Sequence, residues 1–171
     1  MLFRSIEYIK SGSSGHIFKG YMDDKNIAIK IVAYSKKGNY GLPSNKDRPE
    51  NSEIRILKLL SDLVINRETP HIILPITTIY SSIDSFTGNN IIKSIVNESQ
   101  SKKLSKYEEF VKRFNKGEYH DYCSILITEW ANCGDLLEFI RTHSLKLKLP
   151  HWRNIFFQII ATLAIIHQKY Q

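Results

Sequence analysis

The sequence contains few cysteines and no apolar run long enough to cross a membrane. Its two cysteines, Cys123 and Cys133, are too few for a disulfide scaffold and indicate free thiols in a reducing compartment. The N-terminus lacks the apolar core of a signal peptide. The longest apolar region, Ile155 to Ile166, is interrupted by Gln158 and is too short for a bilayer. We therefore expect no membrane span and no disulfide framework.

Acidic residues are scarce, since 17 Asp and Glu face 24 Lys and Arg, giving a net charge of +7 in 171 residues. An acidic partner such as a nucleotide, a nucleic acid or a membrane surface therefore has to be considered. Many of the basic residues, however, lie in segments with loop-like composition: Lys36, Lys37, Lys46, Arg48, Lys102, Lys103, Lys106, Lys112, Arg113 and Lys116. We interpret them as solvated loop charge and expect no specific nucleic-acid partner.

The N-terminal part has the pattern of an antiparallel sheet followed by a helix. Residues 3–9, 16–21 and 27–32 are strand-like, and a polar loop follows over 33–48. A helix is predicted from Pro49 to about Val64, capped by Asn45 or Asp47, with apolar residues at helical spacing on one face.

The middle of the chain contains two strand-like segments separated by a long polar segment. Residues 72–80 are predicted to form a strand whose Pro75 indicates an edge or a bulge, and residues 122–128 are apolar enough for a central strand. Residues 81–121 between them have the composition of an insertion, with a helix near 103–114. Aromatic and apolar residues share one face of that helix (Tyr107, Phe110, Val111 and Phe114), and we favour packing on the domain surface over partner docking.

Two helices are predicted at the C-terminal end. Asp135 is placed to cap a short helix that runs to about His143. A longer helix over 151–170 is apolar over most of its circumference, which predicts that it is buried.

The segment from Ile9 to Val32 carries the strongest indication of chemistry. Two short strands flank a Gly/Ser-rich turn that includes Gly12 and Gly15, and the third strand carries Lys30 among apolar residues. Small residues let backbone N–H groups approach an anion closely, so this is either a phosphate-covering hairpin or an ordinary meander. These residues alone do not decide between the two.

Taken in order, the motifs resemble the N-terminal lobe and hinge of a eukaryotic-type protein kinase. Residues 9–17 resemble the glycine-rich loop, and Ala28-Ile29-Lys30 resembles the Val-Ala-Ile-Lys strand. Glu53 occupies the place of the helix-C glutamate. Residues 126–131 look like the last strand and the hinge, and Gly134-Asp135-Leu136 resembles the start of the next helix.

The resemblance implies an α+β fold. Residues 1–129 are expected to form a kinase-like N-lobe, a five-stranded antiparallel sheet plus helix C, with the insertion at about 81–121. Residues 130–171 would be the hinge and the first two helices of a truncated C-lobe. The richness in isoleucine, asparagine and lysine, with the hinge sequence over 129–135, resembles the atypical serine/threonine kinases of large DNA viruses.

The resemblance also implies an ATP site in a serine/threonine kinase. Lys30 would reach the α- and β-phosphates and Glu53 would hold Lys30, the two catalytic positions. The Glu129 carbonyl and the Ala131 amide would bind adenine, and Asp135 would accept a hydrogen bond from ribose. The nucleotide-binding positions so implied are Ile9, Gly12, Ser13, Gly15, Ile17, Ala28, Lys30, Thr128, Glu129, Ala131 and Asp135.

The sequence departs from the kinase pattern in two ways. Lys10 replaces the first glycine of the loop, and Ser14 replaces the usual aromatic residue at its tip. Neither His-Arg-Asp nor Asp-Phe-Gly occurs, and these motifs carry the catalytic base and the magnesium ligands. We therefore expect Mg²⁺ only if a missing C-lobe is supplied, and no phosphoryl transfer by this chain in isolation.

Two function classes follow. The first is the ATP-binding part of a kinase, with ATP and a protein substrate as partners, in the cytoplasm, or in the host cytoplasm or virion if the protein is viral. The alternative is a non-catalytic kinase remnant that docks on a protein partner.

Overall fold

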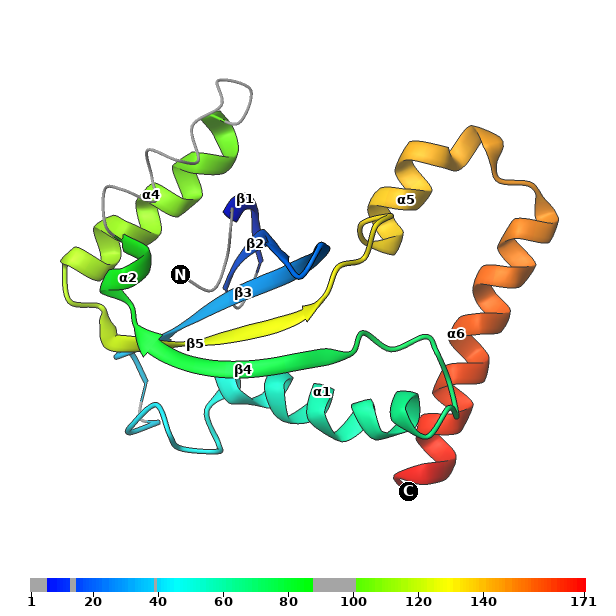
Figure 1. Ribbon diagram of the computed structural model, residues 1–171, viewed down its shortest axis with the longest axis horizontal. Coiled ribbons are helices and arrows are strands. Elements are labelled where there is room, and N and C mark those ends of the chain that lie inside the picture. The colour runs from blue at the N-terminus through cyan, green and yellow to red at the C-terminus, as the bar shows by residue number, and fades with distance from the viewer. Residues whose placement is uncertain (1–5, 13–14, 39, 88–100) are drawn as a thin grey trace. The chain divides into compact units, whose positions relative to one another are not determined.

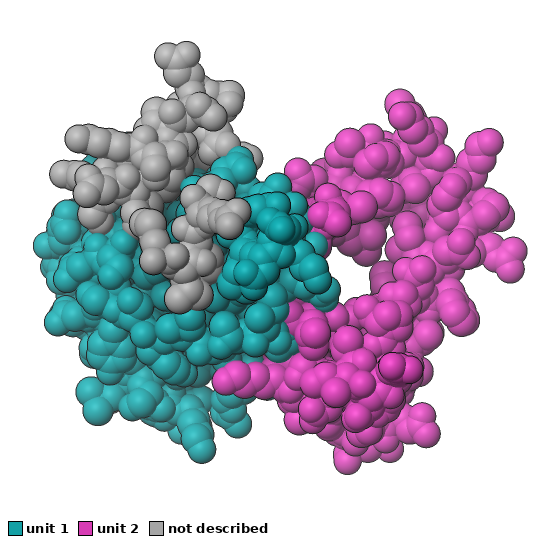
Figure 2. All heavy atoms as spheres, in the orientation of Figure 1, with its two compact units in different colours: residues 1–56, 75–130 teal, residues 57–74, 131–171 magenta. Residues whose placement is uncertain are grey.

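The computed structural model describes residues 6–12, 15–38, 40–87 and 101–171 (Figure 1). Residues 3–5 of the first predicted strand, and Ser13 and Ser14 of the glycine turn, lie outside these ranges. The chain divides into a sheet unit, residues 1–56 and 75–130, and a helical unit, residues 57–74 and 131–171 (Figure 2).

The sheet unit is built on five antiparallel strands. They are β1 (Ile6–Ser11), β2 (His16–Met22), β3 (Lys25–Ser35), β4 (Pro75–Ser82) and β5 (Tyr119–Glu129). Their order in the sheet is β1-β2-β3-β5-β4, so β4 lies at an edge and β5 is internal. The predicted antiparallel sheet is confirmed, as are the edge strand with Pro75 and the central strand after residue 121.

The hairpin turns explain why the first three strands pair. In the β1–β2 turn, the Gly12 amide donates to the Gly15 carbonyl at 2.8 Å. Between β2 and β3, Asp23 and Asp24 have φ of +47° and +60°, and Met22 pairs directly with Lys25. Aspartate tolerates this left-handed backbone better than most residues, which makes a two-residue hairpin turn available here.

The first helix, α1 (Pro49–Ile65), forms where the sequence predicted it. The preceding loop differs from expectation because Arg48 is buried rather than solvated. Its guanidinium donates to the carbonyls of Gly41 and Ser35 and to the Glu50 carboxylate. A cation is stable in that position because each of these oxygens compensates for lost water. Asn45 is not the helix cap: its side-chain oxygen accepts from the Asp47 amide.

The insertion contributes α2 (Asp84–Thr87) and α4 (Ser101–Asn115) to the sheet unit. Figure 1 shows α4 and the start of α1 on opposite sides of the sheet. Tyr107 and Phe110 of α4 are buried in the main core cluster, with Val111 and Phe114 partly buried against it. The predicted packing of this aromatic face is therefore confirmed, and it extends into the core itself.

The helical unit contains α5 (Leu136–His143), a short 3₁₀ turn (Ser144–Lys146) and α6 (Leu149–Lys169). Asp135 caps α5 as predicted, since its carboxylate accepts from the Glu138 amide at 2.8 Å. The predicted burial of the long helix is wrong. Only Thr162 is buried, because the unit packs one side of α6 and leaves the other side, including Phe157 and Ile160, exposed.

Residues 57–74 supply the packed side of α6. The Thr162 hydroxyl hydrogen-bonds the Thr69 hydroxyl at 3.2 Å, Lys169 forms an ion pair with Glu68, and the Tyr170 hydroxyl donates to the Leu59 carbonyl. Within the described ranges, no helix combines the length and apolar character that a bilayer crossing requires.

Candidate functional site: a lysine–glutamate pair on one face of the sheet

The strand register places several predicted site residues on one face of the sheet. Ile17 pairs with Lys30, Lys30 with Leu126, and Ala28 with Thr128. Directly paired residues in antiparallel strands point to the same side, and alternate residues along a strand do so too. Ile17, Ala28, Lys30 and Thr128 therefore share a face.

Lys30 is joined on that face to the first half of α1. Its ammonium group donates to the Glu53 carboxylate. The Lys30 side chain is 17% exposed and that of Glu53 is 41% exposed, so the pair is partly buried with the carboxylate open to solvent. The contact fixes a cation in the middle of the sheet face. It also supplies the counter-ion that a carboxylate bordering the apolar side of α1 requires.

The two glycines of the β1–β2 turn differ in how much space the fold leaves for a side chain. A Cβ atom on Gly15 would lie 2.3 Å from the Ile31 carbonyl oxygen, so the backbone of β3 passes too close for any side chain. A Cβ on Gly12 would meet only the Gly15 oxygen, at 3.6 Å. The fold therefore requires glycine at 15 but not at 12. Ser13, the third predicted turn residue, lies outside the described residues.

Ile9 lies at an irregularity in β1. The register with β2 shifts between Tyr8 and Lys10, and Lys10 then pairs with Ile17. Lys10, which stands where the resemblance expects a glycine, is thus placed on the same face as Lys30. A bulge of this kind bends the strand and increases its local twist just before the turn.

The predicted hinge residues are divided between the two units. Thr128 and Glu129 end β5, and the Thr128 hydroxyl donates to the Glu129 carbonyl at 3.1 Å. Ala131 and Asp135 belong to the helical unit. Within that unit the Ala131 carbonyl accepts from the Gly134 amide, and Asp135 is engaged as the cap of α5.

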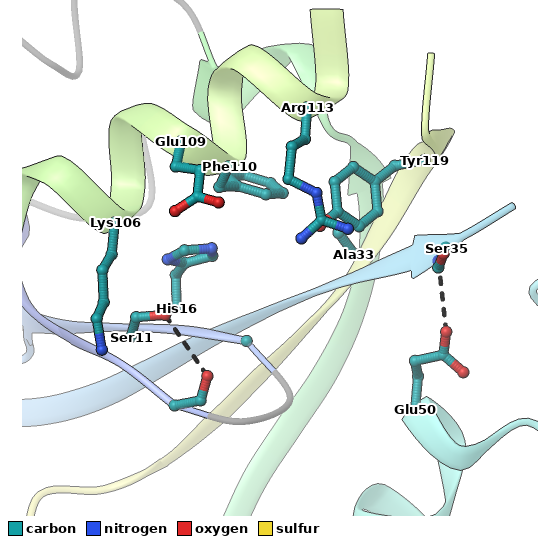
Figure 3. A pocket seen from close by; sticks show the side chains of 12 residues that line it. Ser11, His16, Ala33, Ser35, Glu50, Lys106, Glu109, Phe110, Arg113 and Tyr119 are labelled. Atoms are coloured by element: carbon teal, nitrogen blue, oxygen red, sulfur yellow. Dashed lines mark hydrogen bonds between the residues drawn. The ribbon is translucent and has the colours of Figure 1, made fainter. Parts of the chain in front are cut away.

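A second feature, which the sequence did not indicate, lies on the opposite face of the sheet. A cavity of about 380 Å³ is lined by Ser11, Gly12, Gly15, His16, Ala33, Ser35, Glu50, Lys106, Glu109, Phe110, Arg113 and Tyr119. Figure 3 shows Lys106, Glu109 and Arg113 extending from α4 toward the strands that carry His16 and Ser11. The aromatic face of α4 was the only sequence signal for it.

Charge around this cavity is balanced rather than of one sign. Two basic side chains, Lys106 and Arg113, and two acidic ones, Glu109 and Glu50, line it. Burial lowers the pKa of His16 to about 4, so its imidazole is neutral near pH 7. Burial opposes ionisation of Glu50, but hydrogen bonds from Arg48 and from the backbone outweigh it and lower the pKa of that carboxyl.

No family model matches the chain. A search of curated proteins finds similarity to a protein of Acanthamoeba polyphaga mimivirus named "Putative serine/threonine-protein kinase R400". The two sequences are 43% identical over 166 residues, which make up 95% of this chain and 35% of the relative. The chain therefore spans about a third of the length of this relative.

The similarity supports a kinase-like protein. It agrees with the resemblance read from the ordered motifs, and the viral source of the relative agrees with the narrower resemblance to viral kinases. The α+β architecture with its five-stranded antiparallel sheet is compatible with a kinase N-lobe.

Proposed function

We propose that this chain is the ATP-binding part of a serine/threonine protein kinase, which transfers the γ-phosphoryl group of ATP to protein hydroxyl groups. The observation that carries the proposal is the ion pair between Lys30 of β3 and Glu53 of α1. It lies on the sheet face that also holds Ile17, Ala28 and Thr128. In kinases an ion pair between these two elements orients the nucleotide phosphates.

In this proposal each group acts through charge or backbone geometry. Lys30 binds the α- and β-phosphates, while Glu53 holds the ammonium in place. The turn of Gly12, Ser13 and Gly15 covers the phosphates, since small residues allow the backbone to approach an anion. A mobile lysine would lose side-chain entropy on binding, and the ion pair reduces that loss.

The remaining positions would hold the nucleoside. Ile9, Ile17 and Ala28 would provide apolar contacts to the adenine ring. The Glu129 carbonyl and the Ala131 amide would form the two hydrogen bonds to its edge, beside Thr128. Asp135 would accept a hydrogen bond from ribose in addition to capping α5, because a carboxylate has acceptor sites for several hydrogen bonds.

Magnesium is expected only with residues beyond those in this sequence. Among the residues that the structure describes, no group of three or more His, Cys, Asp or Glu side chains is placed to hold a metal ion. The kinase motifs that bind magnesium are also not found in these 171 residues. The proposal is therefore tested on nucleotide binding, not on phosphoryl transfer.

The test is nucleotide-dependent stabilisation of the purified chain. ATP at a hundred times its dissociation constant should raise the free energy of unfolding by about 2.7 kcal/mol, visible as a higher Tm. Lys30→Met should remove this response, because the variant loses the cation that faces the phosphates. Lys25→Met, at the exposed β2–β3 turn, is the matched control and should respond like the wild type.

Two results would count against the proposal. One is a wild-type chain whose Tm does not respond to ATP. The other is a Lys30→Met variant that responds as strongly as Lys25→Met, which would mean that the nucleotide binds elsewhere.

The alternative, a remnant that docks on a protein partner, is not favoured by a specific observation. The exposed side of α6 is apolar, with Phe156, Phe157 and Ile160 open to solvent. That exposure fits docking on another protein and fits packing against further chain of a longer kinase equally well. The Lys30–Glu53 pair, by contrast, is the observation on which the first proposal rests.

A further inference from the structure

The glycine turn is flanked by two aromatic side chains that point away from the proposed nucleotide. Tyr8 precedes the turn in β1 and His16 follows it in β2, and neither is solvent-exposed. The registers place Tyr8 opposite Phe18, and His16 opposite Ile31, on the face opposite Lys30. The two strands that carry the turn are thus held by contacts on their outer face.

Helix α4 supplies those contacts. The ring centroid of Tyr107 lies 5.3 Å from that of Tyr8, 5.2 Å from His16 and 5.7 Å from Phe18. The Phe110 centroid lies 4.4 Å from that of His16. Aromatic pairs at these separations stabilise beyond the area they bury. Helix α4 therefore contacts both strands of the glycine hairpin, β1 and β2.

The helix is anchored independently of the hairpin. The Tyr107 hydroxyl donates to the Phe86 carbonyl of α2, and the Phe110 ring contacts that of Tyr119 in β5. Arg113 donates to Glu118, just before β5. These contacts tie α4 to the β4–β5 side of the sheet, so the helix can transmit a fixed position to β1 and β2.

The hairpin depends on this support for two reasons. Strand β1 is at the edge of the sheet, with β2 as its one neighbour. Closer to the turn, Ser11, Gly12 and Gly15 border a cavity, so they have less packing on that side. Segments with few buried contacts open more easily than the core, so the aromatic contacts of Tyr8 and His16 set where the strand ends at Gly12 and Gly15 lie.

We propose that α4, through Tyr107 and Phe110, is a positioning element for the glycine turn and thereby sets the affinity for the phosphates of the bound nucleotide. Tyr107 and Phe110 are positioning residues, since they lie on the far face of the sheet from Lys30. The inference rests on the proposed function. It adds that helix α4 of the insertion controls nucleotide binding from the face of the sheet opposite Lys30.

The test compares two ligands that differ only in their phosphates. In Phe110→Leu the affinity for ATP, measured by calorimetry, should fall about tenfold, because Gly12 and Gly15 are no longer held in the position that the phosphates require. The affinity for adenosine should stay unchanged, since adenosine does not reach the turn. Phe114→Leu, the same change one turn further along α4, is the control and should bind both ligands like the wild type.

The outcomes separate the two proposals. A wild-type chain that binds neither ligand overturns the proposed function. If the wild type binds both, unchanged ATP affinity in Phe110→Leu overturns the positioning role. An equal loss for ATP and adenosine also overturns it, because it would indicate general destabilisation of the sheet.

A second variant keeps the test open if Phe110→Leu does not fold. Tyr107→Phe retains the ring and removes only the hydrogen bond to Phe86 that anchors it. ATP affinity should then fall about threefold, the size expected from one modest interaction, again without a change for adenosine. Wild-type affinity for ATP in Tyr107→Phe, together with an unfolded Phe110→Leu, would overturn the proposal.

Discussion

Of the two glycines in the β1–β2 turn, only Gly15 lies where the fold leaves no room for a side chain. In Gly15→Ala the new methyl group would lie 2.3 Å from the Ile31 carbonyl oxygen, and only backbone movement would relieve the clash. We expect the free energy of unfolding to fall by about 1–3 kcal/mol, the usual cost of overpacking, measured by urea denaturation. Gly12→Ala is the matched comparison and should change stability by less than about 0.5 kcal/mol.

The same pair separates folding from binding. Gly12→Ala should weaken the binding of ATP while leaving the free energy of unfolding unchanged. The fold has room for a methyl group at position 12, so only a bound phosphate would require a small residue there. Equal stability of the two alanine variants would contradict the close approach at Gly15.

His16 makes stability depend on pH in a defined window. Its pKa is lowered to about 4 in the folded chain by burial, from an ordinary value near 6.5. Below pH 6.5 the His16 imidazole therefore becomes protonated in the unfolded chain but stays neutral in the folded chain. The free energy of unfolding consequently falls as the pH drops toward 4. The full loss from this group is about 3 kcal/mol. Above pH 6.5 the imidazole is neutral in both states and contributes no pH dependence.

The measurement is urea unfolding at pH 7.0, 5.5 and 4.5 for the wild type and His16→Phe. The phenylalanine keeps a ring against Tyr8, Tyr107 and Phe110, while the charged groups at the cavity, Lys106, Glu109 and Arg113, are the same in both proteins. The difference in stability between the two should shrink or reverse in favour of the variant as the pH falls. A difference that is constant with pH would contradict the buried neutral imidazole. His71→Phe, at an exposed position, is the control.

At the scale of elements, local patterns predicted most of the sheet unit. Alternation and turn residues located the strands, and the run after Pro49 located α1 nearly to the residue. These signals are local because each arises from a single strand, turn or helix face. The pairing of Lys30 with Glu53 came from the ordered motifs of a resembling family, since nothing local links residues 23 positions apart.

What the sequence could not reveal was which neighbours an element would find. Arg48 belongs to a polar loop and was assigned to solvent, yet three backbone and side-chain oxygens gather around it. Burial of α6 was inferred from its apolar circumference, but burial also requires a packing partner on every side. The sequence shows the polarity of a side chain, but the residues that pack around that side chain are known only from the fold.

Across the whole molecule, apolar side chains are unevenly covered. The sheet unit buries aromatic groups on both faces, whereas α6 presents Phe156, Ile160 and Leu163, spaced at helical intervals along one side, to solvent. Phe157 beside them is 73% exposed. A contiguous apolar surface of this kind promotes association in water, because contact between two such surfaces removes apolar area from solvent.

We therefore expect this chain to associate with itself as its concentration rises, in sedimentation velocity at moderate salt. Replacing Phe157 and Ile160 together by serine should shift the distribution toward the monomer. Stability should change by less than about 0.5 kcal/mol per site, since both side chains are exposed in the monomer. Leu145→Ser is the control, because Leu145 is fully exposed but lies in the 3₁₀ turn away from the helix face. A wild-type chain that stays monomeric at every concentration, or an equal shift from Leu145→Ser, would show that the apolar side of α6 does not drive association.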